Sequence, residues 1–192
     1  MKVKQLKVNK ILRRRKREKL SPHRCGSKRR GKLFVKGKFR YYVYSALATL
    51  AVGGLSALLT FGNMDIYDTV KTPPLSPPSL LFPIAWTVLY LLMSVSFTRV
   101  LLRQRHSPRL CRNTVSLYAL NLVFNLLWSP IFFNCRAFLF SFVWLVLLWF
   151  IIFVMTVNFY RTDKIAGLLL IPYLLWVTFA GYLNLGIYIL NR

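Results

Sequence analysis

The chain has 192 residues, of which 56% are hydrophobic, and its 28 Lys and Arg residues face only four acidic ones, giving a net charge of +24. A soluble domain holds about 45–50% apolar and about 25% charged residues, so an ordinary soluble domain is excluded. Two histidines and four acids also leave too few side chains for a metal-dependent or two-carboxylate hydrolase. We therefore predict no metal site and no catalytic residue of these kinds.

The first 40 residues form a basic arm that holds 18 of the 28 basic residues and one acid, Glu18. Beside an acidic bilayer, each Lys or Arg contributes about 1 kcal/mol of attraction. We expect the arm to be disordered or surface-bound and to contact the anionic headgroups of membrane lipids. Nucleic acid is the less favoured partner, although the basic run 13–17 would also contact phosphates.

Five apolar runs follow the arm, each free of charge and long enough to cross a bilayer. They cover residues 41–61, 80–98, 115–133, 137–159 and 165–190. The predicted fold is an all-α membrane protein, with a basic arm over residues 1–40 and a five-transmembrane-helix bundle over residues 41–192. The short connection 134–136 predicts an antiparallel hairpin, and Pro172 predicts a kink or tilt in the last span.

The distribution of basic residues predicts the orientation, because Lys and Arg accumulate on the cytoplasmic side of membrane proteins. With a cytoplasmic arm, 25 basic residues lie inside and only Lys71, Arg136 and Arg192 lie outside. We expect an integral, multi-pass membrane protein with a cytoplasmic N-terminus, located in the cell membrane if the source is prokaryotic.

Small residues recur at every fourth position of the first span: Ser45, Thr49, Gly53 and Ala57. Such a stripe lets helix backbones approach closely in lipid. We interpret it as packing within the bundle, in preference to a contact between two copies of the chain.

The third span carries its polar and amphipathic residues on one helix face. Tyr118, Asn121, Asn125 and Trp128 follow one another at offsets of 3, 4 and 3. An amide without a partner is costly in hydrocarbon, so this face should point into the bundle. Two interpretations stay open: hydrogen bonds between helices, or a pocket for a flat ligand with polar edges.

Two other spans carry stripes at the spacing i, i+4, i+8. They are Trp86, Tyr90 and Ser94 in the second span, and Trp176, Ala180 and Asn184 in the fifth. Each stripe alone is more typical of a core or an interfacial belt, but three stripes in one bundle favour an internal pocket. The fourth span is almost wholly apolar, so we expect Trp144 and Trp149 to face lipid.

The first connection, residues 62–79, holds four prolines between positions 73 and 78, which enforce a stiff, extended path. This segment either closes the mouth of the pocket on the non-cytoplasmic face or serves as a structured linker.

Three segments together resemble one family. They are TPPLSPPSLLFPIAWTVLY (72–90), LYALNLVFNLLWSPIFFN (117–134) and IPYLLWVTFAGYLNLGIYILN (171–191). The patterns P-P-x-x-x-F-P-x-x-W-T-x-L-Y, L-N-x-x-x-N and P-Y-x-x-W-x-x-F-A-x-x-L-N occur in this order in the TspO/MBR family of tryptophan-rich sensory proteins and translocator proteins. The resemblance runs from about residue 67 to residue 191 and leaves the arm outside.

The resemblance implies a five-helix sensor or translocator that binds protoporphyrin or another heme-like tetrapyrrole in a pocket within the bundle, with no covalently bound cofactor. The alternatives are a light-dependent porphyrin-degrading enzyme, or an adaptor that acts on lipids or partners through its arm. Together with the stripes, the resemblance predicts these ligand-binding residues: Tyr67, Trp86, Tyr90, Asn121, Asn125, Trp128, Trp176, Ala180 and Leu183. We expect the ligand among the second, third and fifth spans.

The resemblance also implies a homodimer through small residues of the third helix. In this chain only Ala119 is small among Ala119, Val123 and Leu127. A dimer through that face therefore stays an alternative.

Overall fold

The computed structural model describes residues 27–63 and 69–192, with side chains from residue 39 onward. The chain divides into two units, Met1–Gly37 and Lys38–Arg192, and the second unit contains the bundle. Residues 1–26 and Tyr67 lie outside the described residues, and with them lie most of the expectations for the arm. Helix α2 (Ser27–Leu59) begins within the basic arm.

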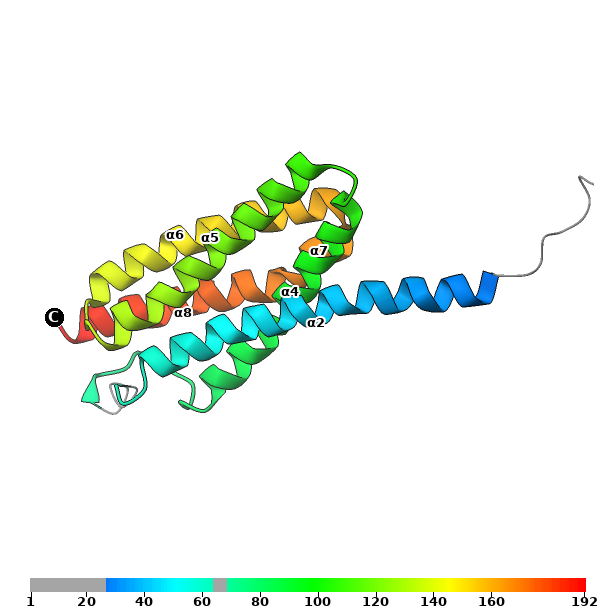
Figure 1. Ribbon diagram of the computed structural model, residues 1–192. Coiled ribbons are helices and arrows are strands. Elements are labelled where there is room, and N and C mark those ends of the chain that lie inside the picture. The colour runs from blue at the N-terminus through cyan, green and yellow to red at the C-terminus, as the bar shows by residue number, and fades with distance from the viewer. Residues whose placement is uncertain (1–26, 64–68) are drawn as a thin grey trace, which may run out of the picture. The chain divides into compact units, whose positions relative to one another are not determined.

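Five helical stretches are long and apolar enough to cross a membrane (Figure 1). They are Phe39–Leu59 of α2, α4 (Leu81–Gln104), α5 (Pro108–Phe133), α6 (Phe138–Thr162), and Lys164–Leu190, which comprises α7 (Lys164–Leu169) and α8 (Ile171–Leu190). Within residues 27–63 and 69–192 there is no strand. The predicted all-α, five-helix membrane fold is confirmed.

Local sequence explains two of the joins between helices. Between α5 and α6 the chain reverses within residues 134–137, where Arg136 adopts a left-handed conformation (φ +51°). The last span breaks between α7 and α8, where Pro172 lies in the first turn of α8. Proline has no N–H to donate to the carbonyl four residues earlier, so α7 ends and α8 begins here. This break agrees with the predicted kink in the last span.

Helix α6 contacts α4, α5, α7 and α8. One stripe of its side chains is almost completely buried: Leu145, Leu148, Ile152, Met155 and Phe159. Trp144 and Trp149, which were expected to face lipid, are partly exposed, and their indole N–H groups donate to Phe124 O and Thr178 Oγ1, each at 2.9 Å. Apolar composition does not distinguish a lipid-facing surface from one packed against apolar neighbours.

An ion cluster ties α4 to the start of α7. Asp163 caps α7 by accepting from the N–H groups of Ile165 (3.0 Å) and Ala166 (3.2 Å), and it also binds Arg99 (3.0 Å) and Arg103 (2.8 Å). Burial raises the pKa of the Asp163 carboxyl. The hydrogen bonds from Arg99 and Ala166 and the two positive charges outweigh burial and hold that pKa below its ordinary value.

The proline-rich segment is attached to α8. Lys71 exchanges two hydrogen bonds of 2.9 Å with the Asn191 side chain, and Tyr182 donates to Pro74 O at 2.8 Å. Pro73 is buried against Gly186, where an added Cβ would lie 2.7 Å from the proline ring. Residues 71–74 therefore behave as a structured linker along α8, and only the end of the segment reaches the cavity described next.

A candidate ligand-binding cavity

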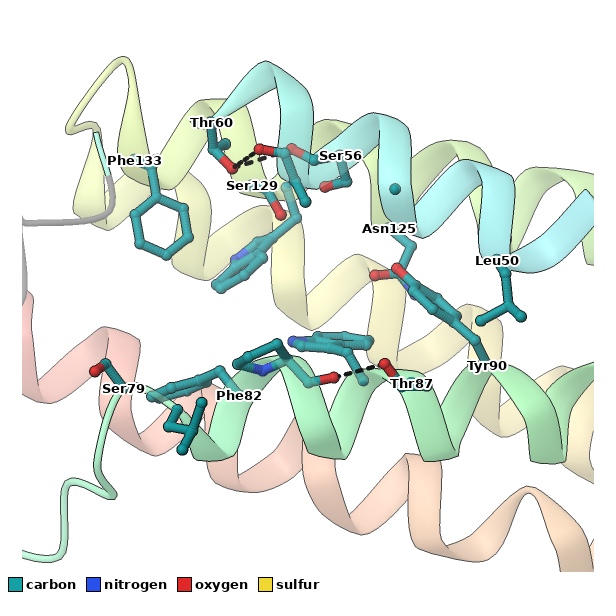
Figure 2. A pocket seen from close by; sticks show the side chains of 17 residues that line it. Leu50, Ser56, Thr60, Ser79, Phe82, Thr87, Tyr90, Asn125, Ser129 and Phe133 are labelled. Atoms are coloured by element: carbon teal, nitrogen blue, oxygen red, sulfur yellow. Dashed lines mark hydrogen bonds between the residues drawn. The ribbon is translucent and has the colours of Figure 1, made fainter. Parts of the chain in front are cut away.

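A cavity of about 630 Å³ lies between α2, α4 and α5 (Figure 2). Small-molecule pockets usually measure about 300–1,000 Å³, so the cavity is large enough for an organic ligand. Its lining comprises Leu50, Gly53, Gly54, Ser56, Ala57, Thr60, Ser79, Leu80, Phe82, Pro83, Trp86, Thr87, Tyr90, Asn125, Trp128, Ser129 and Phe133. None of these side chains is charged.

Small residues of α2 make one wall. Gly53 allows the Tyr90 ring to pack directly on the α2 backbone, because a Cβ at this position would overlap the ring. An added Cβ at Gly54 would meet no atom within 4 Å. The four-residue stripe of the first span thus has two roles. Ser45 and Thr49 bind neighbouring helices through Ser94 O (3.2 Å) and Tyr118 OH (2.7 Å), whereas Gly53 and Ala57 line the cavity.

Aromatic side chains of α4 and α5 form much of the remaining wall. Trp86 and Tyr90 lie one turn apart on α4 with ring centroids 5.6 Å apart. Trp128 of α5 is buried, and its indole Nε1 has no hydrogen-bond partner among the described residues. Aromatic faces attract flat π systems in offset or edge-on geometry, so this wall suits a flat, conjugated ligand.

The polar face of α5 both forms hydrogen bonds between helices and lines the cavity, which are the two interpretations that its spacing left open. Asn121 and Asn125 donate to the hydroxyl of Tyr173 in α8, at 3.2 and 2.7 Å, which joins the two helices inside the bundle. Asn125 also lines the cavity, and Figure 2 shows Tyr90 reaching from α4 toward it. Because the Nδ2 of Asn125 donates to Tyr173, its Oδ1 is the atom that could accept a hydrogen bond from a ligand. Asn121 lies outside the lining and acts in the contact between helices.

Four of the nine sequence-predicted site residues line this cavity: Trp86, Tyr90, Asn125 and Trp128. The residues of the fifth span do not line it. Trp176 packs edge-on against Phe82, which lines the cavity, with centroids 6.0 Å apart, but Trp176 is not itself part of the lining. Ala180 and Leu183 are buried in α8, and the described lining contains no α8 residue.

The main difference from the sequence prediction is the helix that completes the pocket. The expected set was the second, third and fifth spans, but the cavity is completed by the first span, α2. Sequence reasoning missed Gly54, Ser56 and Thr60. The available signal was the small-residue stripe of the first span, which was interpreted as packing alone.

A sequence model of the TspO/MBR family matches residues 45–190. Protein CrtK of Rhodobacter capsulatus is 38% identical over 151 residues, covering 79% of this chain and 90% of that protein. The tryptophan-rich protein TspO of Chlorobaculum tepidum is 41% identical over 125 residues, covering 65% and 78%. The translocator protein of Bos taurus is 29% identical over 133 residues, covering 69% and 79%. The matched region contains the whole cavity lining.

Proposed function

The chain belongs to the TspO/MBR family, and from this premise we propose that it binds protoporphyrin or a similar heme-like tetrapyrrole in the cavity between α2, α4 and α5. Family membership and the five spans make it an integral, multi-pass membrane protein and support a role as a sensor or translocator. The identity of the ligand as a tetrapyrrole is the part that we propose.

The aromatic wall is the observation that carries the proposal. A macrocycle offers two π faces, and each aromatic contact contributes about 0.5–1.5 kcal/mol beyond the burial of apolar area. Trp86, Tyr90 and Trp128 supply such contacts from two helices, and Asn125 supplies a neutral hydrogen-bonding group for a polar ring edge. The size and the uncharged lining of the cavity favour the same ligand class.

The absence of charge in the lining also predicts how the ligand is oriented. Tetrapyrrole propionates are anionic, and an unpaired charge inside apolar surroundings is very costly. The propionates should therefore stay in water or among headgroups. The end of the cavity at Ser79 and Leu80, which are both exposed, is where they would emerge.

Titration of purified protein with protoporphyrin, followed by the absorbance of the porphyrin, tests the proposal. Replacing Trp86→Phe or Trp128→Phe should weaken binding by about two- to tenfold, since each substitution reduces one aromatic contact. Trp149→Phe is the matched control, because Trp149 contacts Thr178 and lies outside the lining. Equal affinity of all three variants and the wild type would exclude this cavity as the site.

Two controls separate the alternatives. Binding that disappears at high salt would indicate attraction of propionates to the basic arm, because surface electrostatics are screened by salt. Consumption of porphyrin under illumination, slowed by Trp86→Phe, would favour the degrading enzyme.

For the arm we propose contact with anionic lipid headgroups on the cytoplasmic side, supported by its 18 basic residues and one acid. The full chain should then bind vesicles that contain phosphatidylserine more tightly at low salt than at high salt. Labelling of cysteines introduced in the arm and in residues 69–79 from opposite sides of the membrane would agree with the proposed orientation. Labelling of both segments from one side would contradict it.

A further inference from the structure

The cavity extends to the lipid-facing perimeter of the bundle. On α2, Gly54 lines the cavity and also belongs to an exposed helical row with Leu47, Ala51 and Leu58, at offsets of 4, 7 and 11. Leu47 and Leu58 are 61% and 73% exposed. In a membrane-spanning helix such a row faces lipid, so Gly54 lies at the border between lipid and cavity.

Helix α4 presents the matching border. Thr87 lines the cavity and is flanked on its helix face by the exposed Ile84 and Leu91, and the adjacent Val88 is exposed as well. The hydroxyl of Thr87 donates to Pro83 O at 2.8 Å, so its donor is used within the helix (Figure 2). A lipid-soluble molecule passing Thr87 therefore meets no unsatisfied donor there.

On its other side, α2 is joined to α5 and its C-terminal cap by two hydrogen bonds. Thr49 bonds Tyr118 at 2.7 Å near one end of the cavity, and Asn134 Nδ2 donates to Leu59 O at 2.8 Å near the other end. Ser56, which lies between these two contacts, and Thr60, which directly follows the second one, are buried. Ser45 and Gly53 contact α4 through Ser94 O and the Tyr90 ring, and both residues precede Gly54 along α2.

We propose that ligands reach the cavity from within the bilayer, through the gap between α2 and α4 that Gly54 and Thr87 border. This proposal rests on the proposed function. It adds the route by which a ligand enters the cavity and the kind of molecule that can take this route. Gly54 keeps the gap open because it has no side chain, and an added Cβ would meet open space. Because the passage is uncharged and faces hydrocarbon, it admits molecules that dissolve in lipid and whose leading part carries no charge.

The route is tested by binding kinetics in vesicles that contain the reconstituted full chain and protoporphyrin. At a fixed free aqueous concentration of porphyrin, the association rate should follow the mole fraction of porphyrin in the lipid. A rate that follows only the aqueous concentration would overturn the bilayer route while leaving the binding itself intact. Failure of the wild type to bind at all would instead contradict the proposed function.

A substitution pair locates the gap. Gly54→Phe should slow association by about tenfold, as expected for a side chain that must be displaced from the passage. Leu58→Phe, one turn along the same lipid-facing row and outside the lining, should leave the association rate unchanged. If Gly54→Phe accelerates dissociation without slowing association, it only fills the cavity and the proposed gap is wrong. If Gly54→Phe does not fold, Thr87→Phe approaches the same gap from α4 and is judged by the same criterion.

Discussion

Adjacent glycines in α2 should respond to the same substitution with opposite signs. In Gly53→Ala, the new methyl group would lie 2.7 Å from Cδ2 of Tyr90 and closer still to its Cε2. The ring cannot move away freely, because Tyr90 is buried and lies next to Trp86 with centroids 5.6 Å apart. In Gly54→Ala, the methyl group would meet nothing within 4 Å.

The difference between the two variants isolates the packing cost. Replacing Gly by Ala in a helix gains up to about 1 kcal/mol through helix propensity, and this gain is common to both positions. Overpacking costs about 1–3 kcal/mol and applies only at Gly53. Gly53→Ala should therefore be less stable than Gly54→Ala by about 1–3 kcal/mol.

Reversible unfolding of the purified protein in mixed micelles, followed by circular dichroism, measures this difference. Porphyrin titration of the same samples should show weaker binding for Gly53→Ala, because the displaced Tyr90 ring intrudes on the cavity. Equal stability of the two variants, or a less stable Gly54→Ala, would refute the close packing of α2 on Tyr90 and with it the shape of the cavity.

Three further outcomes are expected. The Asp163 carboxylate, whose pKa is lowered in the folded state, contributes stability that is fully present above its unfolded pKa of about 3.9 and is lost as the pH falls through the lower folded value. The free energy of unfolding measured from pH 7 to pH 2 should fall over this acid range. In Asp163→Asn this pH dependence should disappear, and the free energy of unfolding at pH 7 should be lower by about 1–3 kcal/mol, because the helix cap and the partly exposed ion pairs are weakened together. Asn125→Leu should weaken porphyrin binding by about fivefold through loss of one hydrogen bond, as isothermal titration would measure, while Asn121→Leu should mainly lower stability. Leu75 is 82% exposed and has φ +70°, so Leu75→Asn should raise the unfolding free energy by about 1 kcal/mol with no change in ligand affinity, and a loss of stability would contradict the left-handed conformation.

The number, order and approximate limits of the spans could be predicted because a helix that crosses the bilayer needs a minimum length and an apolar composition. Both can be read directly from the sequence. The break at Pro172 and the hairpin at residues 134–136 were predictable for the same reason: their causes are local. Helical spacing also placed Asn121 and Asn125 on one inward face. Helical spacing did not separate the roles of these two residues. Both donate to Tyr173 of α8, but only Asn125 also lies beside the cavity.

The identity of the pocket-forming helices could not be predicted from the same patterns. Trp86 and Trp176 head stripes of identical spacing, yet Trp86 lines the cavity and Trp176, which contacts Phe82 edge-on, is outside the lining. Periodicity specifies a face of a helix but not the neighbour opposite that face. Gly53 and Gly54 contribute through the side chains they lack, and their effect is defined only by Tyr90 and by the open space beside them.

The location of the ligand is tested most directly by determining the structure of the full chain with bound protoporphyrin. The macrocycle is expected between α2, α4 and α5, with a ring face against Trp86 or Trp128, a polar edge near Asn125 Oδ1, and the propionates directed toward Ser79. A macrocycle bound against Trp176 and α8, with the cavity between α2, α4 and α5 unfilled, would contradict the proposed site.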